Sequence, residues 1–210
     1  MRIGLIGAGN IGGTLARHFV RVGHDVVLSN SRGPESLSEL TAELGGQAQA
    51  ATAADTARSC DVVVVSVPFG RYRELPSDGL AGKVVIDTNN YYPQRDGHFE
   101  QLDSDDTTSS ELLQQHLPAA RVVKAFNAIR WQHLRDYGLP AGDPARIGIP
   151  VSGDDEDAKQ MVAELIDQIG FDAVDAGPLA EGGREHQPGT SAYAADLRTD
   201  ELRARALLTA

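Results

Sequence analysis

The six residues from 7 to 12 restrict the possible fold of this chain more than any other stretch of its sequence. They read Gly-Ala-Gly-Asn-Ile-Gly and follow a short apolar run at residues 2–7. After them, apolar side chains recur with the spacing of an amphipathic helix, at Ile11, Leu15, Phe19 and Val22. A glycine turn between a buried strand and a helix is typical of the phosphate-binding loop of a dinucleotide site.

Each glycine of this turn has a separate structural role in such a loop. Gly7 turns the chain, Gly9 lets the backbone approach a pyrophosphate, and Gly12 lets helix and strand touch. The free N–H groups and the positive end of the helix then bind the anion without a lysine. We therefore predict that the cofactor phosphates bind at Gly7, Gly9, Asn10, Ile11 and Gly12. The alternative is a tight glycine turn that binds nothing.

Short β-branched runs alternate with helical periods along the rest of the chain. Strands are predicted at residues 2–7, 25–29, 47–50, 61–67, 83–88, 121–125, 147–151 and 171–175. Helices are predicted at residues 10–22, 35–44, 52–59, 111–117, 158–169 and 200–208, with a polar, exposed loop after Asn90. This alternation favours an α/β fold of the Rossmann type, with a doubly wound, mainly parallel sheet. We expect a dinucleotide-binding domain at residues 1–176 and a short C-terminal extension at 177–210 packed on it.

The composition excludes several classes of partner. The 30 acidic and 19 basic residues give a formal net charge of −11, which repels nucleic acid and anionic membrane surfaces. The single cysteine, Cys60, cannot form an internal disulfide and is expected in the core, and the histidines are scattered. The apolar runs are too short for a signal peptide or a membrane-spanning helix. We therefore expect a cytoplasmic protein with no metal site and no nucleic-acid or membrane partner.

The choice between NAD and NADP is usually determined about 20 residues after the glycine turn, at the end of the second strand. Chains that bind NAD place an acid there, which binds the ribose 2′-hydroxyl. This chain instead reads Ser-Asn-Ser-Arg-Gly-Pro at residues 29–34. Arg32 can form a forked contact with a 2′-phosphate while Ser31 donates a hydrogen bond, which favours NADP by about 10–100-fold. The alternative is that Arg32 is a solvated turn residue.

Four further stretches resemble a known family. They are residues 85–90 (Val-Ile-Asp-Thr-Asn-Asn), 122–127 (Val-Val-Lys-Ala-Phe-Asn), 152–155 (Ser-Gly-Asp-Asp) and 175–180 (Asp-Ala-Gly-Pro-Leu-Ala). With the glycine turn and Ser31-Arg32, they make the chain similar to the NADPH-dependent oxidoreductases typified by NADPH:coenzyme F420 reductase, whose acceptor is a deazaflavin. The chain also resembles the cytosolic reductase domain of the six-transmembrane metalloreductases, which pass a hydride from NADPH to a flavin.

This resemblance implies roles for residues outside the glycine turn. The wall beside the bound dinucleotide would be formed by Val67, Pro68 and Phe69. Asn89 would lie near the nicotinamide, and Phe126 and Asn127 on the acceptor side. There an aromatic ring could stack on a planar acceptor and an amide could hold the nicotinamide carboxamide, although ordinary core packing is the alternative for the aromatic residues. The resemblance also implies a homodimer.

The chemistry implied by the resemblance requires little from the protein. Hydride transfer between two planar cofactors depends on placement rather than on an acid, so we expect no catalytic acid or base. Reduction of a carbonyl or imine would instead require a proton donor, for which the candidates are Tyr91, Tyr92, Lys124 and His133. No motif places any of the four, and the Tyr-x-x-x-Lys pair of short-chain dehydrogenases does not occur.

The leading hypothesis is an NADPH-dependent oxidoreductase that transfers a hydride between NADP(H) and a deazaflavin (coenzyme F420) or a flavin-like acceptor. A reductase of ketoacids or imines is disfavoured, because about 35 residues follow the predicted sheet and a helical dimerisation domain needs roughly 100. The third hypothesis is a non-catalytic NADP(H) redox sensor. Near the end of the chain, Arg203 and Arg205 are expected either to lie on a solvated helix face or to bind an anionic tail of the acceptor.

Overall fold

The computed structural model describes residues 1–206, which contain an eight-stranded sheet in the order β3-β2-β1-β4-β5-β6-β7-β8. The strands are β1 (Arg2–Ile6), β2 (Asp25–Ser29), β3 (Ala48–Ala50), β4 (Val62–Val65), β5 (Val84–Asp87), β6 (Arg121–Lys124), β7 (Gly148–Gly153) and β8 (Asp172–Gly177). Neighbouring strands are parallel except β6 and β7, which pair antiparallel. The predicted Rossmann-type, mainly parallel sheet is confirmed.

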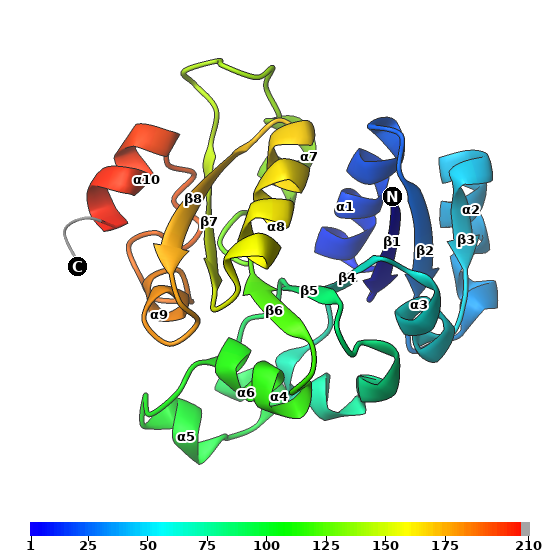
Figure 1. Cartoon of the computed structure of the whole chain (residues 1–210), viewed down its shortest axis with the longest axis horizontal. Coiled ribbons are helices and arrows are strands. Elements are labelled where there is room, and N and C mark those ends of the chain that lie inside the picture. Colours follow the sequence, from blue (N-terminus) through cyan, green and yellow to red (C-terminus); the bar gives the residue numbers. More distant parts are fainter. Residues whose placement is uncertain (207–210) are drawn as a thin grey trace.

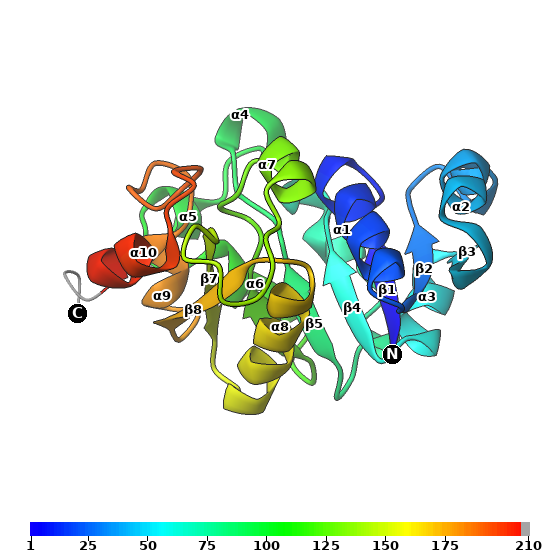
Figure 2. The same ribbon diagram turned by 90° about the horizontal axis from the view of Figure 1, so that it is seen from above.

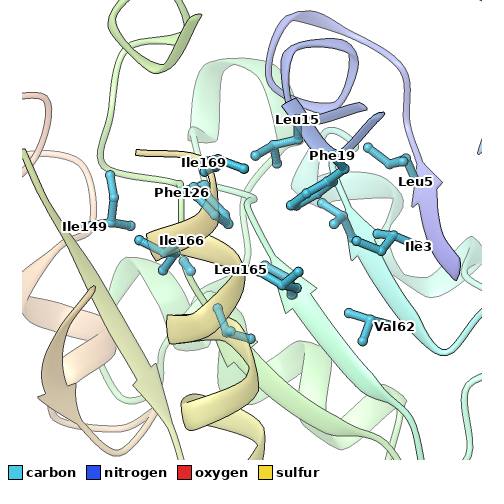
Figure 3. Packing of buried hydrophobic residues seen from close by; sticks show 14 of the residues in the cluster. Ile3, Leu5, Leu15, Phe19, Val62, Phe126, Ile149, Leu165, Ile166 and Ile169 are labelled. Atoms are coloured by element: carbon cyan, nitrogen blue, oxygen red, sulfur yellow. The ribbon is translucent and has the colours of Figure 1, made fainter. Parts of the chain in front are cut away.

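Helices cover both faces of this sheet (Figures 1 and 2). They are α1 (Asn10–Arg21), α2 (Ser38–Leu44), α3 (Ala53–Ser59), α4 (Pro93–Asp96), α5 (Glu100–Asp103), α6 (Ser109–His116), α7 (Trp131–Asp136), α8 (Glu156–Gln168), α9 (Gly182–Glu185) and α10 (Thr199–Ala206). Side chains of α1, α2, α7 and α8 pack on one face, and those of α3 and α6 on the other. On the first face, Phe19 and Leu165 join the buried β1 residue Ile3 in one core (Figure 3).

Local sequence signals determine where several of these helices begin and end. Helix α1 buries Leu15 and Phe19 and ends before Gly23, whose φ of +91° suits glycine. Helix α8 begins after Asp155, whose carboxylate accepts a hydrogen bond from the Ala158 N–H at 2.8 Å. Acids at the start of this helix therefore stabilise it, as the sequence suggested.

The structure differs from the predicted elements in three regions, one of which is the unpredicted short helix α9. The stretch after Asn90 contains α4 and α5, and the ring of Phe99 lies edge-on to Phe69 with 5.4 Å between centroids, so this stretch is partly buried and not simply an exposed loop. The short helix α7 was not predicted, because six residues are too few for a clear helical period.

The C-terminal helix is present up to Ala206, while Leu207 and Leu208 of the predicted helix lie outside the described residues. Leu202 of this helix is buried against Gly148 of β7. The division of the chain at residue 176 stays a prediction.

The sheet topology fixes where a ligand can bind. Strand β1 lies between β2 and β4, so the chain leaves β1 toward one side of the sheet and crosses over to the other side at β4. In doubly wound sheets the ligand crevice lies outside the carboxyl ends of the strands at such a reversal. The glycine turn follows β1 directly and therefore lies at this crevice.

Candidate dinucleotide-binding site

The three motif glycines meet different surroundings. At Gly7, with φ at +106°, an added Cβ would lie 2.0 Å from the Ser66 carbonyl oxygen, and at Gly12 it would lie 1.9 Å from the Gly7 carbonyl oxygen. At Gly9 an added Cβ would meet nothing within 4 Å. Packing therefore requires glycine at Gly7 and Gly12, whereas Gly9 borders open space from which a ligand can approach the backbone.

Helix α1 starts at this open position. Its N-cap residue is Gly9, which offers no side-chain cap, and its first turn contains no acid. The first N–H groups of the helix therefore keep their capacity to bind an anion, and the helix dipole adds to the attraction.

A cavity of about 310 Å³ lies on the β2 side of the glycine turn. Ser31 and Arg32 line it, as predicted, and the Arg32 N–H donates to Asn30 Oδ1 at 2.9 Å, which holds the loop in a turn. Arg71 and Glu74 line the same cavity and form an ion pair at 2.6 Å. Arginines from two separate segments, Arg32 and Arg71, thus line one cavity. Arg71 was not predicted, since no motif distinguishes it from an ordinary surface cation.

A second cavity of about 420 Å³ lies on the other side of the turn, beside the ends of β5 and β6. Gly9, Ser66, Val67 and Pro68 line both cavities, so the two form one cleft that crosses the glycine turn. Val67 and Pro68 thus lie where the resemblance places the wall of the cofactor site. Asn10, Ile11 and Asn89 line the second cavity only.

Asn89 lines this second cavity and has a buried amide N–H without a partner among the described residues. Its side chain is buried, and because the Val67 N–H donates to it at 2.9 Å, the atom facing Val67 is Oδ1. The other atom, Nδ2, has no hydrogen-bond partner among the described residues. A buried N–H donor without a partner is costly, so a ligand oxygen at this position would be stabilising.

The two phenylalanines lie where neither ring can contact a ligand in the cleft. Phe69 is fully buried, stacks on Tyr72 with 4.7 Å between ring centroids, and lines neither cavity. Phe126 borders the second cavity, but its ring is fully buried in the core (Figure 3). Its backbone has a φ of +61°, so the chain turns sharply at this residue. Phe69 thus supports the wall from behind, and stacking of Phe126 on an acceptor does not fit this arrangement.

Both N–H groups of the Asn127 side-chain amide are used by protein partners. Its Nδ2 donates to Asn90 Oδ1 at 3.0 Å and to the His186 carbonyl oxygen at 2.8 Å. Its Oδ1 lies 2.8 Å from His186 Nδ1, which must be the donor, so Nε2 of His186 accepts from Ser152 Oγ at 2.8 Å. Burial and the nearby Lys124 keep the pKa of His186 well below its ordinary value. The expected bond from Asn127 to a carboxamide therefore does not fit, and Asn89 has the free amide N–H instead.

A buried ion pair supports Asn89 from below. Lys124 and Asp87 are both fully buried and lie 3.8 Å apart. Lys124 Nζ donates to the Asn89 carbonyl oxygen at 3.2 Å, and the Asn89 N–H donates to Asp87 Oδ1 at 2.9 Å. Burial lowers the pKa of Lys124, which Asp87 partly opposes. Lys124 lines neither cavity, so it acts on the backbone of Asn89 and not on a ligand.

Of the four proton-donor candidates, Tyr92 lines the cleft and Tyr91, Lys124 and His133 do not. The hydroxyl of Tyr92 lies 2.5 Å from that of Tyr193, and burial raises the pKa of Tyr92, as does this hydrogen bond. Tyr193 and Trp131 also line the second cavity. Neither was predicted, because Tyr193 belongs to the C-terminal segment, which reaches the cleft through a hydrogen bond from the Ala194 N–H to the Ala128 carbonyl oxygen at 2.7 Å.

Residues 1–206 contain no helix with both the length and the apolar character needed to cross a membrane. The same residues hold no cluster of three or more histidine, cysteine, aspartate or glutamate side chains suited to a metal ion.

The chain is similar to known oxidoreductases. Residues 2–91 match the family model described as NADP oxidoreductase, coenzyme F420-dependent. The chain is 31% identical over 195 residues to the F420-dependent NADP reductase of Methanothermobacter thermautotrophicus, covering 85% of this chain and 82% of that protein. It is 32% identical over 182 residues to metalloreductase STEAP3 of Rattus norvegicus, covering 85% of this chain and 34% of the rat protein. The chain thus spans about a third of the length of that relative.

One solved structure is similar to this protein over nearly the whole chain. The crystal structure of a hypothetical protein from Sinorhizobium meliloti superposes with a TM-score of 0.81 and 32% identity, covering 95% of this chain and 96% of that one. The similarity therefore includes the second half of the chain, which the family model does not match. Together with the glycine turn and the cleft, these likenesses establish that the chain belongs to the family of coenzyme F420-dependent NADP oxidoreductases.

Proposed function

We propose that this protein is a reductase that uses NADPH to reduce a planar, deazaflavin- or flavin-like acceptor. The observation that carries the proposal is the single cleft across the glycine turn, with two arginines in one half and tyrosine and tryptophan side chains in the other. The family relationship is consistent with this, since a relative covered over 82% of its length is named an F420-dependent NADP reductase.

The first half of the cleft suits the adenosine end of NADPH. Arg32 and Arg71 line it from two sides, and the carboxylate that lines it, Glu74, is already paired with Arg71 at 2.6 Å. A 2′-phosphate carries about two negative charges, so it gains from Arg32 and competes with Glu74 for Arg71. The 2′-hydroxyl of NADH gains neither contact. We therefore assign the preference for NADPH to Arg32, with Arg71 in support.

The second half of the cleft suits the nicotinamide and the acceptor. The free N–H of Asn89 can donate to the carboxamide oxygen and so fix the face that the ring presents. When bound, NADPH supplies the hydride: the acceptor gains this hydride and a proton from solvent, and NADP⁺ remains. Tyr92, Tyr193 and Trp131 provide aromatic surface for the acceptor ring.

The test is steady-state oxidation of NADPH and of NADH in the presence of coenzyme F420, FMN, FAD or a ferric chelate. We expect turnover with NADPH and at least one ring acceptor. If the nicotinamide absorbance does not fall with any of these acceptors, although NADP⁺ and NADPH both bind tightly, the result would instead support a redox sensor.

A further inference from the structure

The acceptor half of the cleft is positively charged within a strongly acidic protein. Among the described residues that line it, none is an aspartate or glutamate, and two, Arg95 and Arg130, are arginines. The chain as a whole carries a formal net charge of −11. An anion therefore approaches against the field of the whole protein, and a local cation is needed to hold it.

Arg95 is already used by its neighbours. Its guanidinium donates to the Asn90 carbonyl oxygen at 2.7 Å and to the Asp96 carboxylate at 2.8 Å, and it lies 4.9 Å from the centre of the Tyr92 ring. Burial tends to raise the pKa of Asp96, but its bonds to Arg95 and to backbone N–H groups lower it overall, so this pair is charged. Arg95 thus holds Tyr92 in place and has little charge left for a ligand.

Arg130 is in the opposite situation. It precedes the first turn of α7, is exposed, and forms no side-chain hydrogen bond or ion pair with any residue in the part of the chain that the structure describes. The next residue, Trp131, also lines the cavity. In the acceptor half of the cleft, Arg130 is thus a cation without a partner among the described residues, and it precedes a tryptophan whose ring lies 5.1 Å from the Arg135 guanidinium.

The arginines near the C-terminus lie elsewhere. Arg203 lines a separate groove beside β8 with Lys159 and Asp175. Arg205 donates to the Ser191 carbonyl oxygen at 2.5 Å, and neither arginine lines the cleft. Binding of an acceptor tail by Arg203 or Arg205 therefore does not fit the structure.

We propose that Arg130 binds a negatively charged group, phosphate or carboxylate, attached to the acceptor ring. Preferred acceptors are then planar aromatic molecules with an anionic tail, and the neutral ring alone is a poor substrate. This inference rests on the proposed function, because it assigns the acceptor to the cavity lined by Tyr92, Trp131 and Tyr193. A charge-assisted hydrogen bond to Arg130 raises the affinity for the anionic acceptor by about tenfold over the neutral one.

The test compares rings that differ only in the tail. FMN is paired with riboflavin, and coenzyme F420 with its tail-less deazaflavin. Binding of each to the protein saturated with NADP⁺ is followed by calorimetry and by fluorescence of Trp131, the single tryptophan of the chain, which adjoins Arg130. The variants are Arg130→Gln and the matched control Arg58→Gln, which removes an exposed charge paired with Asp55 outside the lining of the cleft.

We expect the wild-type protein and the Arg58→Gln control to bind the anionic member of a pair about tenfold more tightly, and Arg130→Gln to bind both members equally. Equal binding of both members by the wild-type protein, with turnover intact, would overturn this inference and leave the proposed function standing. A rise in the KM for NADPH in Arg130→Gln, independent of the acceptor, would overturn it by assigning Arg130 to the cofactor pyrophosphate. If no ring binds, the proposed acceptor class is wrong, and this inference with it.

Discussion

Replacing Gly9 or Gly12 by alanine should affect different properties: Gly12→Ala should lower the stability of the fold, and Gly9→Ala should weaken binding of NADPH. In Gly12→Ala, the new methyl group would lie 1.9 Å from a backbone oxygen that cannot move freely, more than 1 Å inside the roughly 3.2 Å of an ordinary contact. Such overlap costs about 3 kcal/mol or more, and the better helix propensity of alanine returns about 1 kcal/mol. We expect a net loss of about 2 kcal/mol in the free energy of unfolding.

Gly9→Ala should behave in the opposite way. The backbone there has φ −79° and ψ −157°, which alanine adopts without strain, and no atom lies within 4 Å of the new methyl group. The unfolded chain loses entropy, so the free energy of unfolding should stay equal or rise by about 0.4–1 kcal/mol. The methyl group would nevertheless keep a pyrophosphate from the N–H groups of α1. Loss of one charge-assisted bond should raise the Kd for NADPH by about 10–100-fold.

Urea unfolding and calorimetric titration with NADPH measure the two effects independently on the same samples. Circular dichroism confirms that each variant is folded before titration. Wild-type affinity for NADPH in Gly9→Ala would refute the placement of the pyrophosphate at this turn. Equal destabilisation of both variants would refute the distinction between packing at Gly12 and open space at Gly9.

Three further perturbations test other parts of the cleft. Arg32→Ala should raise the KM for NADPH by about 10–100-fold and leave that for NADH within about twofold, and equal changes for both cofactors would contradict its assigned contact with the 2′-phosphate. Asn89→Asp keeps the acceptor for the Val67 N–H but removes the free donor, so the Kd values for NADPH and NADH should rise together, by about tenfold in calorimetry. His186 is buried and its pKa is lowered well below the ordinary 6.5, so the unfolded state binds this proton first as the pH falls. The free energy of unfolding should therefore fall by about 1.4 kcal/mol per pH unit below about pH 6.5, and urea unfolding of His186→Gln should show a shallower slope; an unchanged slope would mean that His186 is not held neutral.

The predicted site residues that line the cleft are those whose position depends on local structure. The glycine turn is one chain segment between β1 and α1, and the backbone angle of Gly7 follows from the turn itself. Ser31 and Arg32 likewise follow β2 directly and reach the cleft without help from distant residues. Each of these positions can be read from its own neighbours in the chain.

The parts that were missed come together only through tertiary packing. Tyr193 was missed because it is 101 residues from the candidate Tyr92, and only the C-terminal segment brings it to the same cavity. Arg130 and Trp131 reach the same cavity because the chain turns at Phe126, where a positive φ is rare for a bulky residue. That turn leaves the ring of Phe126 in the core, which was the alternative to stacking on an acceptor.

The two asparagines show why residue type is insufficient even when the position is right. Asn89 and Asn127 both border the acceptor half of the cleft and carry the same amide. Asn90 and His186, the latter 59 residues from Asn127, accept both amide hydrogens of Asn127, whereas the Asn89 oxygen accepts from Val67 and its N–H has no partner among the described residues. The availability of an amide for a ligand is therefore decided by the count of its satisfied hydrogen bonds, which depends on distant residues. On this count we expect Asn89, and not Asn127, to contact the cofactor, while Asn127 holds Asn90 and the C-terminal segment in place.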